Sequence, residues 1–326
     1  MKLSVLDQSV IRMGETASDA FNKTEQLAKL TDDLGYTRFW VAEHHNTNGL
    51  AGTSPEILIS HLATMTDRIR IGSGGVLLPQ YSPFKIAENF NVLQTLYPDR
   101  IDLGIGRSPG GPPTTRLALT DGIRKSLNEF PRQVSELQSY LTNQHTENDV
   151  IAYPLTKQLP EMWMLGVSQR GARLAAEKGT AFTFGHFLVP TSGQVAIEQY
   201  KRDFKPSPFL AEPKVNVCVF IVCAPTREKA EEIALTQDLW LLAVEKGENT
   251  KIPSIEQAKS NRLTEKDKEK IKQNRKRMMI GTPEDVKEQL LLLSEKYQVE
   301  EFMVINNVYS FEDKLYTYNV LADMFL

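Results

Sequence analysis

The sequence predicts an α/β fold of the closed (β/α)8 TIM barrel type, and three observations support this prediction. Strand-like and helix-like segments alternate along the chain, and each of eight strand-like segments is followed by a helix. Strand–helix–strand units build parallel sheets, and eight of them suit a closed barrel, whereas open doubly wound sheets usually have fewer strands. The 326 residues fit one barrel, and no change in composition marks a second domain. We therefore expect a single domain over residues 1–326.

The strand-like segments are short apolar runs that contain aromatic and β-branched residues. This composition is typical of parallel strands that are buried on both faces. In chain order they cover residues 3–6, 39–42, 69–73, 101–105, 162–165, 181–184, 214–223 and 301–305.

The segments between the strands carry the start and stop signals of helices. Ser54 followed by Pro55 is typical of an N-cap and a first helical residue, and glycine at 35 and 179 is typical of a helix end. Pro131 lies inside a helical pattern, where it should end or kink the helix. The expected helices cover residues 19–34, 55–66, 83–96, 121–141, 168–178, 193–204, 227–245, a segment starting at 282, and 311–325.

Two segments do not fit the alternation of strands and helices and are expected to be insertions. Residues 107–120 follow the fourth strand and are rich in proline and glycine. Residues 246–276 precede the eighth strand and carry many charges of alternating sign. Because acids are interleaved with the bases, this second segment indicates a solvated helix or a mobile flap rather than a nucleic-acid surface. Its place ahead of the eighth strand would allow a flap over the barrel mouth.

Composition excludes several classes of partner. The net charge of −3 provides no global field that favours nucleic acid or an anionic membrane. No apolar stretch approaches the roughly 20 residues that span a bilayer, and residues 1–5 do not begin a signal peptide. Cys218 and Cys223 would point to opposite faces of one strand, so no disulfide is expected. We expect a reduced, cytoplasmic protein.

An apolar strand that ends in three ionisable residues marks the candidate active site. The segment 39–45 finishes in Glu43, His44 and His45. Active sites of parallel barrels collect at the carboxyl ends of the strands, so these side chains would lie at the barrel mouth. The alternative is the start of a solvated loop without a catalytic role.

Two neighbouring strands are followed by groups that bind anions. The segment after the fourth strand fails as a dinucleotide fingerprint, because Pro109 stands where the third glycine belongs, but it supplies Arg107. The fifth strand leads through a glycine turn to a helix start at Ser168, where free N–H groups favour anions. Arg107 and Ser168 can therefore embrace one phosphate. Alternatively, Arg107 pairs with a surface acid and Ser168 only caps its helix.

Two further strand ends supply candidate pocket residues. Gly74 and Gly75 follow the third strand, which indicates either close approach of a flat or bulky group or an ordinary bulge. His186 follows the sixth strand and is a candidate for the pocket wall.

No metal site is expected. His44 and His45 would point to opposite faces of a strand, and a catalytic zinc needs a third protein ligand. The remaining histidines are scattered along the chain, and the first of them is expected to be structural; they are His61, His145 and His186.

Taken together, the motifs resemble those of the bacterial luciferase-like flavin monooxygenase family, whose members are flavin-dependent barrels. The similarity runs over nearly the whole chain, and the order and spacing of the motifs carry it. The motifs are Ala42-Glu43-His44-His45, Arg70-Ile71-Gly72-Ser73-Gly74-Gly75, Leu78-Pro79, residues 83–88, Asp99-Arg100-Ile101-Asp102-Leu103-Gly104-Ile105-Gly106-Arg107, residues 165–168 and Gly281-Thr282-Pro283-Glu284-Asp285-Val286.

The resemblance implies an enzyme that binds FMN at the barrel mouth. The FMN would arrive reduced from a separate flavin reductase, since the chain shows no nicotinamide-binding fingerprint. Oxygen would add to it as a C4a-hydroperoxide that oxidises a small organic substrate. His44 matches the family's catalytic histidine, Glu43 is expected to orient it, and titration near neutrality would suit proton transfer.

The resemblance also assigns the flavin contacts. Gly74 and Gly75 would lie against the isoalloxazine ring and share a cis peptide bond. The phosphate would be held by Arg107 and by the turn made of Leu165, Gly166, Val167, Ser168 and Gln169.

Other activities remain possible on the same residues. Gly106 stands where light-emitting members have a reactive cysteine, so light emission is not implied. A deazaflavin (F420)-dependent hydride-transfer enzyme would use similar binding residues, and a flavin-binding protein without turnover is a second alternative. A metal-dependent barrel hydrolase would lack its ligands.

The family resemblance further implies a homodimer joined through the helices at 55–66 and 83–96. The first of these helices is apolar nearly all round, although an outer barrel helix should be amphipathic, so a second covered face implies a partner. Glu88 matches an acid found at that interface. A charge introduced at Ile59 should then give monomers or insoluble protein.

Overall fold

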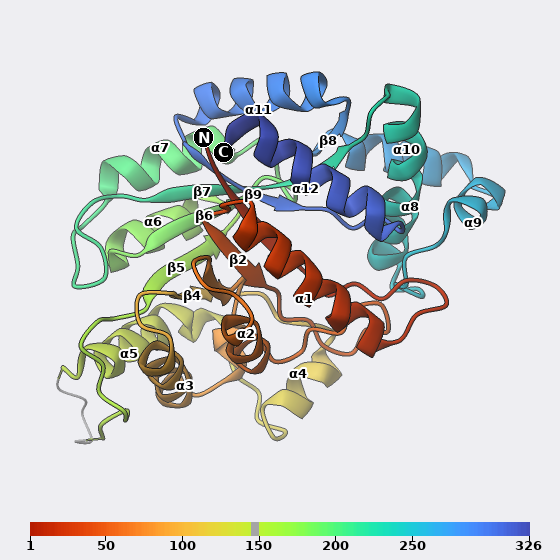
Figure 1. Ribbon diagram of the computed structural model, residues 1–326. Coiled ribbons are helices and arrows are strands. Elements are labelled where there is room, and N and C mark those ends of the chain that lie inside the picture. The colour runs from red at the N-terminus through yellow and green to blue at the C-terminus, as the bar shows by residue number, and fades with distance from the viewer. Residues whose placement is uncertain (145–149) are drawn as a thin grey trace.

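The computed structural model describes residues 1–144 and 150–326 and forms a closed parallel barrel surrounded by helices (Figure 1). Eight strands close the ring in the order β1-β2-β3-β4-β5-β6-β7-β9, and β9 pairs with β1. The (β/α)8 prediction is thereby confirmed. The strands are β1 Lys2–Asp7, β2 Arg38–Val41, β3 Arg70–Ser73, β4 Ile101–Ile105, β5 Glu161–Gly166, β6 Ala181–Gly185, β7 Val215–Cys223, β8 Met278–Gly281 and β9 Glu301–Ile305.

The helices lie outside the barrel and follow the expected order. Pro55 and Pro83 begin two of them, and Gly179 ends another in the left-handed conformation. The helices that were expected are α1 Ala17–Asp33, α2 Pro55–Thr64, α3 Pro83–Leu96, α5 Phe130–Thr142, α6 Gln169–Lys178, α7 Gly193–Asp203, α8 Arg227–Lys246, α11 Pro283–Tyr297 and α12 Phe311–Phe325. The additional helical segments are α4 Pro113–Leu119, α9 Ile255–Ser260, α10 Glu265–Arg275, and the 3-10 turns Leu78–Gln80 and Leu127–Glu129.

One helix prediction was wrong at its start. The expected helix over 121–141 begins only at Phe130, and Pro131 lies in its first turn. Proline is tolerated there because the first N–H groups of a helix have no acceptor within it. Pro131 therefore opens this helix instead of kinking it.

A ninth strand, β8, was not predicted. Its four residues follow a charged helix and contain one β-branched side chain, so they give little strand signal. β8 pairs with Phe220–Cys223 at the far end of β7, whereas β9 pairs with the preceding stretch Val217–Phe220. β7 is therefore long enough to pair with β9 along one part and with β8 along the next. β8 lies outside the closed ring of eight strands.

The insertion segments form structure near the barrel mouth. Residues 107–120 form a loop and α4, and residues 246–276 contain α9 and α10. The charged helix α10 is attached to α8 by ion pairs, including Lys246 with Asp267 at 2.8 Å. Between α8 and α9 the chain crosses the loop that follows β2, where Asn48 Oδ1 accepts from the Thr250 N–H at 3.1 Å. This segment therefore contributes to the wall of the mouth.

A buried ionic network fills the opposite, amino-terminal end of the barrel. Arg38 donates to Glu301 Oε1 and to Asp102 Oδ2, both at 2.6 Å, and to Glu161 Oε1 at 3.0 Å. Arg70 also donates to Asp102, and Lys214 to Glu161, so the cations and carboxylates balance. Above the network, Trp40 and Trp163 meet edge to face with ring centroids 5.3 Å apart. These layers form the floor of the barrel interior.

Two expectations about the chain as a whole can be compared with the structure. Cys218 and Cys223 are both free and buried. None of the helices in the described residues combines the length and apolar character needed to cross a bilayer.

Candidate functional site

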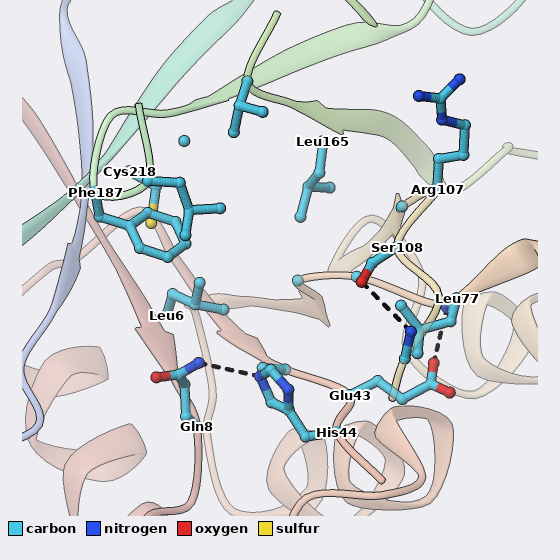
Figure 2. Close-up of a pocket in the computed structure, with 18 of the residues that line it drawn as sticks. Leu6, Gln8, Glu43, His44, Leu77, Arg107, Ser108, Leu165, Phe187 and Cys218 are labelled. Carbon is cyan, nitrogen blue, oxygen red and sulfur yellow. Dashed lines mark hydrogen bonds between the residues drawn. The ribbon is translucent and has the colours of Figure 1, made fainter. Parts of the chain in front are cut away.

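A large cavity opens at the carboxyl ends of the strands. Its volume of about 1570 Å³ exceeds the roughly 300–1,000 Å³ of a pocket for one small molecule. Residues that follow β2, β3, β4, β5 and β6 all contribute to its wall. Figure 2 shows Arg107 on the opposite side of this cavity from Gln8 and His44. The cavity has room for a cofactor and a substrate together.

The Arg107 side of the cavity has the donors that an anion needs. Arg107 is exposed, lines the cavity directly after β4, and has no hydrogen bond or ion pair with any other described residue. Ser168 caps α6, and its Oγ accepts from the Gly171 N–H at 3.4 Å. Arg170 and Arg173 of the same helix also line this side. Guanidinium groups next to a helix N-terminus form a donor set that fits a phosphate.

The predicted phosphate turn is placed at this wall with one exception. Leu165, Gly166, Val167 and Ser168 line the cavity, whereas the Gln169 side chain is exposed and does not line it. A Cβ on Gly106 would meet no atom within 4 Å, so the backbone beside Arg107 borders open space.

Gly74 and Gly75 line the cavity and are joined by a cis peptide bond, as the resemblance predicted. A Cβ on Gly74 would lie 2.5 Å from Leu6 Cδ1, and one on Gly75 would lie 2.8 Å from the backbone of Gly104. Real Cβ atoms do not approach a backbone so closely, so packing against Gly104 requires glycine at position 75. At position 74 the close neighbour is the end of the Leu6 side chain, which can move. The two glycines leave a cavity wall without side chains.

His44 is held as a neutral ring. Its Nε2 lies 3.1 Å from Gln8 Nε2, and Gln8 Oε1 accepts from Asn307 Nδ2 at 2.6 Å. Since an amide nitrogen only donates, His44 Nε2 must accept. Burial, together with the nearby His45, lowers the pKa of His44 to about 4 against the opposing effect of Glu43. The expectation that His44 titrates near neutrality is therefore not met.

Glu43 does not orient His44, contrary to the sequence prediction. Glu43 Oε1 accepts from His45 Nε2 at 2.7 Å and from the Tyr81 hydroxyl at 2.5 Å, and Oε2 accepts from the Leu77 N–H at 2.9 Å. Side chains two residues apart on an extended chain point the same way, and adjacent ones point apart. The partner of Glu43 is therefore His45, while His44 turns toward β1.

The other histidines do not join the site. His186 Nδ1 lies 3.0 Å from the Tyr297 hydroxyl, and the side chain does not line the cavity, so the structure does not support its assignment to the pocket wall. Burial lowers the pKa of His186 to about 4. His61 pairs with Glu25 at the surface at 2.7 Å, and His145 lies outside the described residues. Within residues 1–144 and 150–326, no group of three or more His, Cys, Asp or Glu side chains could hold a metal.

The interior of the cavity is largely apolar. Figure 2 shows Leu6, Phe187 and Cys218 on the side away from Arg107. Burial raises the pKa of the Cys218 thiol well above its usual value, so this thiol stays neutral. Further apolar lining residues include Leu165, Phe220, Trp240, Leu241 and Met303. The cavity therefore suits a ligand with an anionic end and a less polar body.

Several residues of the site were not anticipated. Gln8 and Asn307 lie just beyond β1 and β9, where a polar residue after a predicted strand could have indicated the barrel mouth. His45 could have been paired with Glu43 from their separation by two residues. No sequence signal identified Tyr81, because it reaches Glu43 from a separate connection.

Comparisons with known proteins agree with this architecture. Residues 1–298 match the family model for luciferase-like monooxygenases. The chain is 50% identical to the uncharacterized protein YceB of Bacillus subtilis (strain 168), with 99% of each chain covered. It is 33% identical to the N-acetyl-S-alkylcysteine monooxygenase of the same organism. That alignment covers 100% of this chain and 98% of the relative. The solved structure of apo-MsnO8 superposes with a TM-score of 0.92 at 34% identity, over 99% of this chain and 98% of that chain.

Proposed function

The chain belongs to the luciferase-like monooxygenase family, and from that premise we propose that it is a two-component, FMN-dependent monooxygenase. A separate flavin reductase would supply the reduced FMN, and O2 and a small organic molecule would be the substrates. One observation carries the proposal: a single cavity joins a cationic side at Arg107 and α6 to an apolar interior that also holds His44.

The residues of the cavity would divide the work of binding. Arg107 and the N-terminus of α6 would hold the phosphate, and Gly74–Gly75 would provide the flat wall for the ring system. When bound, the reduced flavin supplies the electrons that activate O2. The apolar interior would exclude water and receive the substrate. One relative at 33% identity is named for oxidation of an N-acetyl-S-alkylcysteine, so thioethers are the first substrates to test.

Flavin titration followed by oxygen measurement tests this proposal. The purified protein is titrated anaerobically with reduced FMN, reduced riboflavin and a reduced deazaflavin, and binding is measured by fluorescence. Air-saturated buffer and a panel of thioethers are then added, and oxygen uptake and product mass are followed. We expect selective binding of FMN and a product heavier by one oxygen atom. Preference for the deazaflavin without oxygen uptake would establish the hydride-transfer alternative, and flavin binding without any product would favour a non-catalytic role.

Arg107→Ala should weaken FMN binding by about 10- to 100-fold, because a hydrogen bond to a charged group contributes roughly 1.5–3 kcal/mol. Riboflavin lacks the phosphate, so its dissociation constant should change less than about twofold in the same titration. Arg202→Ala is the matched control, since Arg202 is exposed and, among the residues that the structure describes, forms an ion pair only with Asp203, at 2.9 Å. Equal weakening of FMN and riboflavin would remove Arg107 from the phosphate site.

The proposal also includes a homodimer, but the substitution that tests it has to be made at a different residue than Ile59. Ile59 is fully buried in the core of its own chain, so a charge there would test folding and not association. Ile57 is 69% exposed and borders a surface groove between α2 and α3, together with Val92 and Leu96. An exposed apolar groove of this kind is typical of an interface.

Ile57→Asp should convert the dimer to a monomer without loss of fold, because the charge would have to be buried at the interface. Light scattering at micromolar concentration measures the mass, and circular dichroism checks the fold. Leu292→Asp is the control, since Leu292 is 58% exposed on α11, away from the groove. A monomeric unmutated protein, or a dimer that survives Ile57→Asp, would contradict this interface.

A further inference from the structure

A further arginine lines the cavity on the side away from Arg107. Arg277 directly precedes β8, and its side chain is 13% exposed. Its Nη1 donates to the carbonyl oxygen of Leu188 at 3.4 Å. Leu188 follows Phe187, which Figure 2 shows on the side of the cavity away from Arg107. The cavity therefore has guanidinium groups on two different sides.

The guanidinium of Arg277 has more N–H groups than the surrounding protein has acceptors for them. An arginine side chain carries five N–H donors. Nη2 donates to Glu245 Oε1 at 2.9 Å and to Asn274 Oδ1 at 2.8 Å. Within the described residues, Nη1 makes one long contact, with Leu188, and the buried Nε has no acceptor. Because an unpaired buried donor is costly, a molecule that brings acceptor atoms to this wall would be stabilised there.

The positive charge of Arg277 is also incompletely balanced. Its carboxylate partner, Glu245, is shared with Lys270, whose Nζ lies 3.3 Å from the same oxygen, Oε1. Two cations thus face one carboxylate. Glu248 lines the cavity as well, but its side chain is exposed, so solvent and salt screen its charge. The wall at Arg277 therefore favours an anionic group over a neutral one.

Two other lining residues carry buried polar atoms without a partner. Trp240 of α8 and Thr183 of β6 are 4% and 3% exposed, and neither Trp240 Nε1 nor Thr183 Oγ1 has a hydrogen bond to a described residue. Trp240 packs edge to face on Phe220 with ring centroids 6.4 Å apart, and Phe220 pairs with Met278, the residue after Arg277. An indole N–H only donates, so Trp240 adds to the demand for acceptors near Arg277.

We propose that Arg277 is a specificity-determining residue that binds a carboxylate of the organic substrate. This inference rests on the proposed monooxygenase function and narrows its substrates to carboxylates with an apolar body. Arg107 serves the phosphate of the cofactor on the opposite side of the cavity, so a second anion on the Arg277 side belongs to the substrate. The apolar residues around Phe187 hold the body of the substrate. A thioether substrate thus binds with its sulfur in the apolar interior and its carboxylate at Arg277.

Binding of a matched pair of ligands tests this inference without turnover. The carboxylate (hexylthio)acetate and the neutral alcohol (hexylthio)ethanol have apolar bodies of the same length. Calorimetric titration of the protein, with and without oxidised FMN, should give at least tenfold tighter binding of the carboxylate. Arg277→Gln should weaken (hexylthio)acetate at least tenfold and (hexylthio)ethanol less than about twofold. Arg277→Lys should retain part of the preference, because it keeps the charge but loses the planar group of donors.

Lys270→Gln is the matched control. Lys270 is the other cation at Glu245 but does not line the cavity, so the preference for the carboxylate should persist in this variant. Circular dichroism should show that Arg277→Gln folds, because Glu245 keeps Lys270 and Asn274 as partners. No preference in the unmutated protein, or equal weakening of both ligands in Arg277→Gln, would overturn the inference. An equal loss of FMN affinity in Arg277→Gln would also overturn it, since Arg277 would then belong to the flavin site.

Turnover with reduced FMN and O2 separates this inference from the proposed function. With (hexylthio)acetate, Arg277→Gln should raise KM at least tenfold and change kcat less than about threefold, because the carboxylate is bound equally before and during the reaction. A carboxylate preference in binding without any oxygen consumption would support the role of Arg277 and reject the monooxygenase function. Oxidation of both ligands with equal KM would reject the role of Arg277 and leave the monooxygenase function in place.

Discussion

Arg38→Met should lower the free energy of unfolding by about 3–5 kcal/mol, since removal of one partner leaves buried charges uncompensated. Arg38 is 1% exposed and contacts Asp102, Glu161 and Glu301 at the amino-terminal end of the barrel. Asp102 is fully buried and Glu301 nearly so. Methionine fills similar space without the charge, so the effect reports the broken network and not a cavity. Urea unfolding followed by circular dichroism measures the change.

Two comparisons separate this effect from a general loss of packing. Arg70→Met removes a cation of the same network whose side chain is 24% exposed, and it should cost distinctly less than Arg38→Met. The triple variant Arg38→Met, Asp102→Asn, Glu301→Gln removes the charge of Arg38 together with those of its two most buried partners, and it should regain part of the lost stability. A loss below about 1 kcal/mol in Arg38→Met would show that the network contributes little.

The stability lost in Arg38→Met should depend on pH, because the carboxyl groups around Arg38 become protonated in acid. Burial alone would raise the pKa of Glu161, but Arg38 and Lys214 outweigh burial and lower it to about 2. A lowered folded-state pKa contributes stability that is present above the unfolded value near 4.5 and is lost as the pH falls toward 2. The difference between the unmutated protein and Arg38→Met should therefore narrow over that range, because protonated carboxyls no longer need the arginine.

The barrel itself could be predicted because its signal is periodic and repeated. Eight apolar runs, each followed by a helix, specify a parallel ring even when individual bounds are uncertain by a few residues. β8 lacked this signal, since its run Met278–Gly281 is short and follows a charged helix. Its formation depends on the far end of β7, with which β9 does not pair, and this tertiary condition is not visible in the composition of the β8 segment.

The site could be predicted by position but not by pairing. The ends of β2, β3, β4 and β5 all border the cavity, so the general rule for barrels placed Glu43, Gly74, Arg107 and Ser168 correctly at the mouth. Which side chains form hydrogen bonds with each other depends on the direction in which each one points. Residues that are adjacent in the sequence were wrongly expected to be partners. Glu43 contacts His45 and not His44, and His186 turns toward Tyr297 of α11.

The choice of a substitution that tests the dimer shows that the sequence also did not predict side-chain direction on helix α2. The apolar positions of α2 serve two different faces, and the sequence alone did not separate them. Ile59 packs into the core, whereas Ile57 lies on the outer surface. A helix that is apolar all round indicates a second covered face, but only the packed structure shows which side chains belong to it.

His44→Ala should reduce product formation by about 10²- to 10⁴-fold, the range for loss of a group that handles protons, while the affinity for reduced FMN changes little. Its Nε2 is occupied by Gln8 at 3.1 Å, so the ring is fixed in the cavity wall on the side away from Arg107. Alanine removes the ring but leaves the cationic side intact. Rapid-mixing measurement of product per bound flavin, beside an anaerobic flavin titration, determines the two effects separately.

The dependence of activity on pH gives a further test of the role of His44. Burial lowers the pKa of His44 to about 4, so the ring is neutral at any pH well above that value. The ratio of unmutated to His44→Ala activity should therefore stay constant between about pH 6 and 9. His61→Ala is the control, because His61 contacts Glu25 at the surface, outside the cavity. Unchanged turnover in His44→Ala would exclude His44 from the chemistry, and a ratio that varies with pH would mean that His44 itself carries the proton.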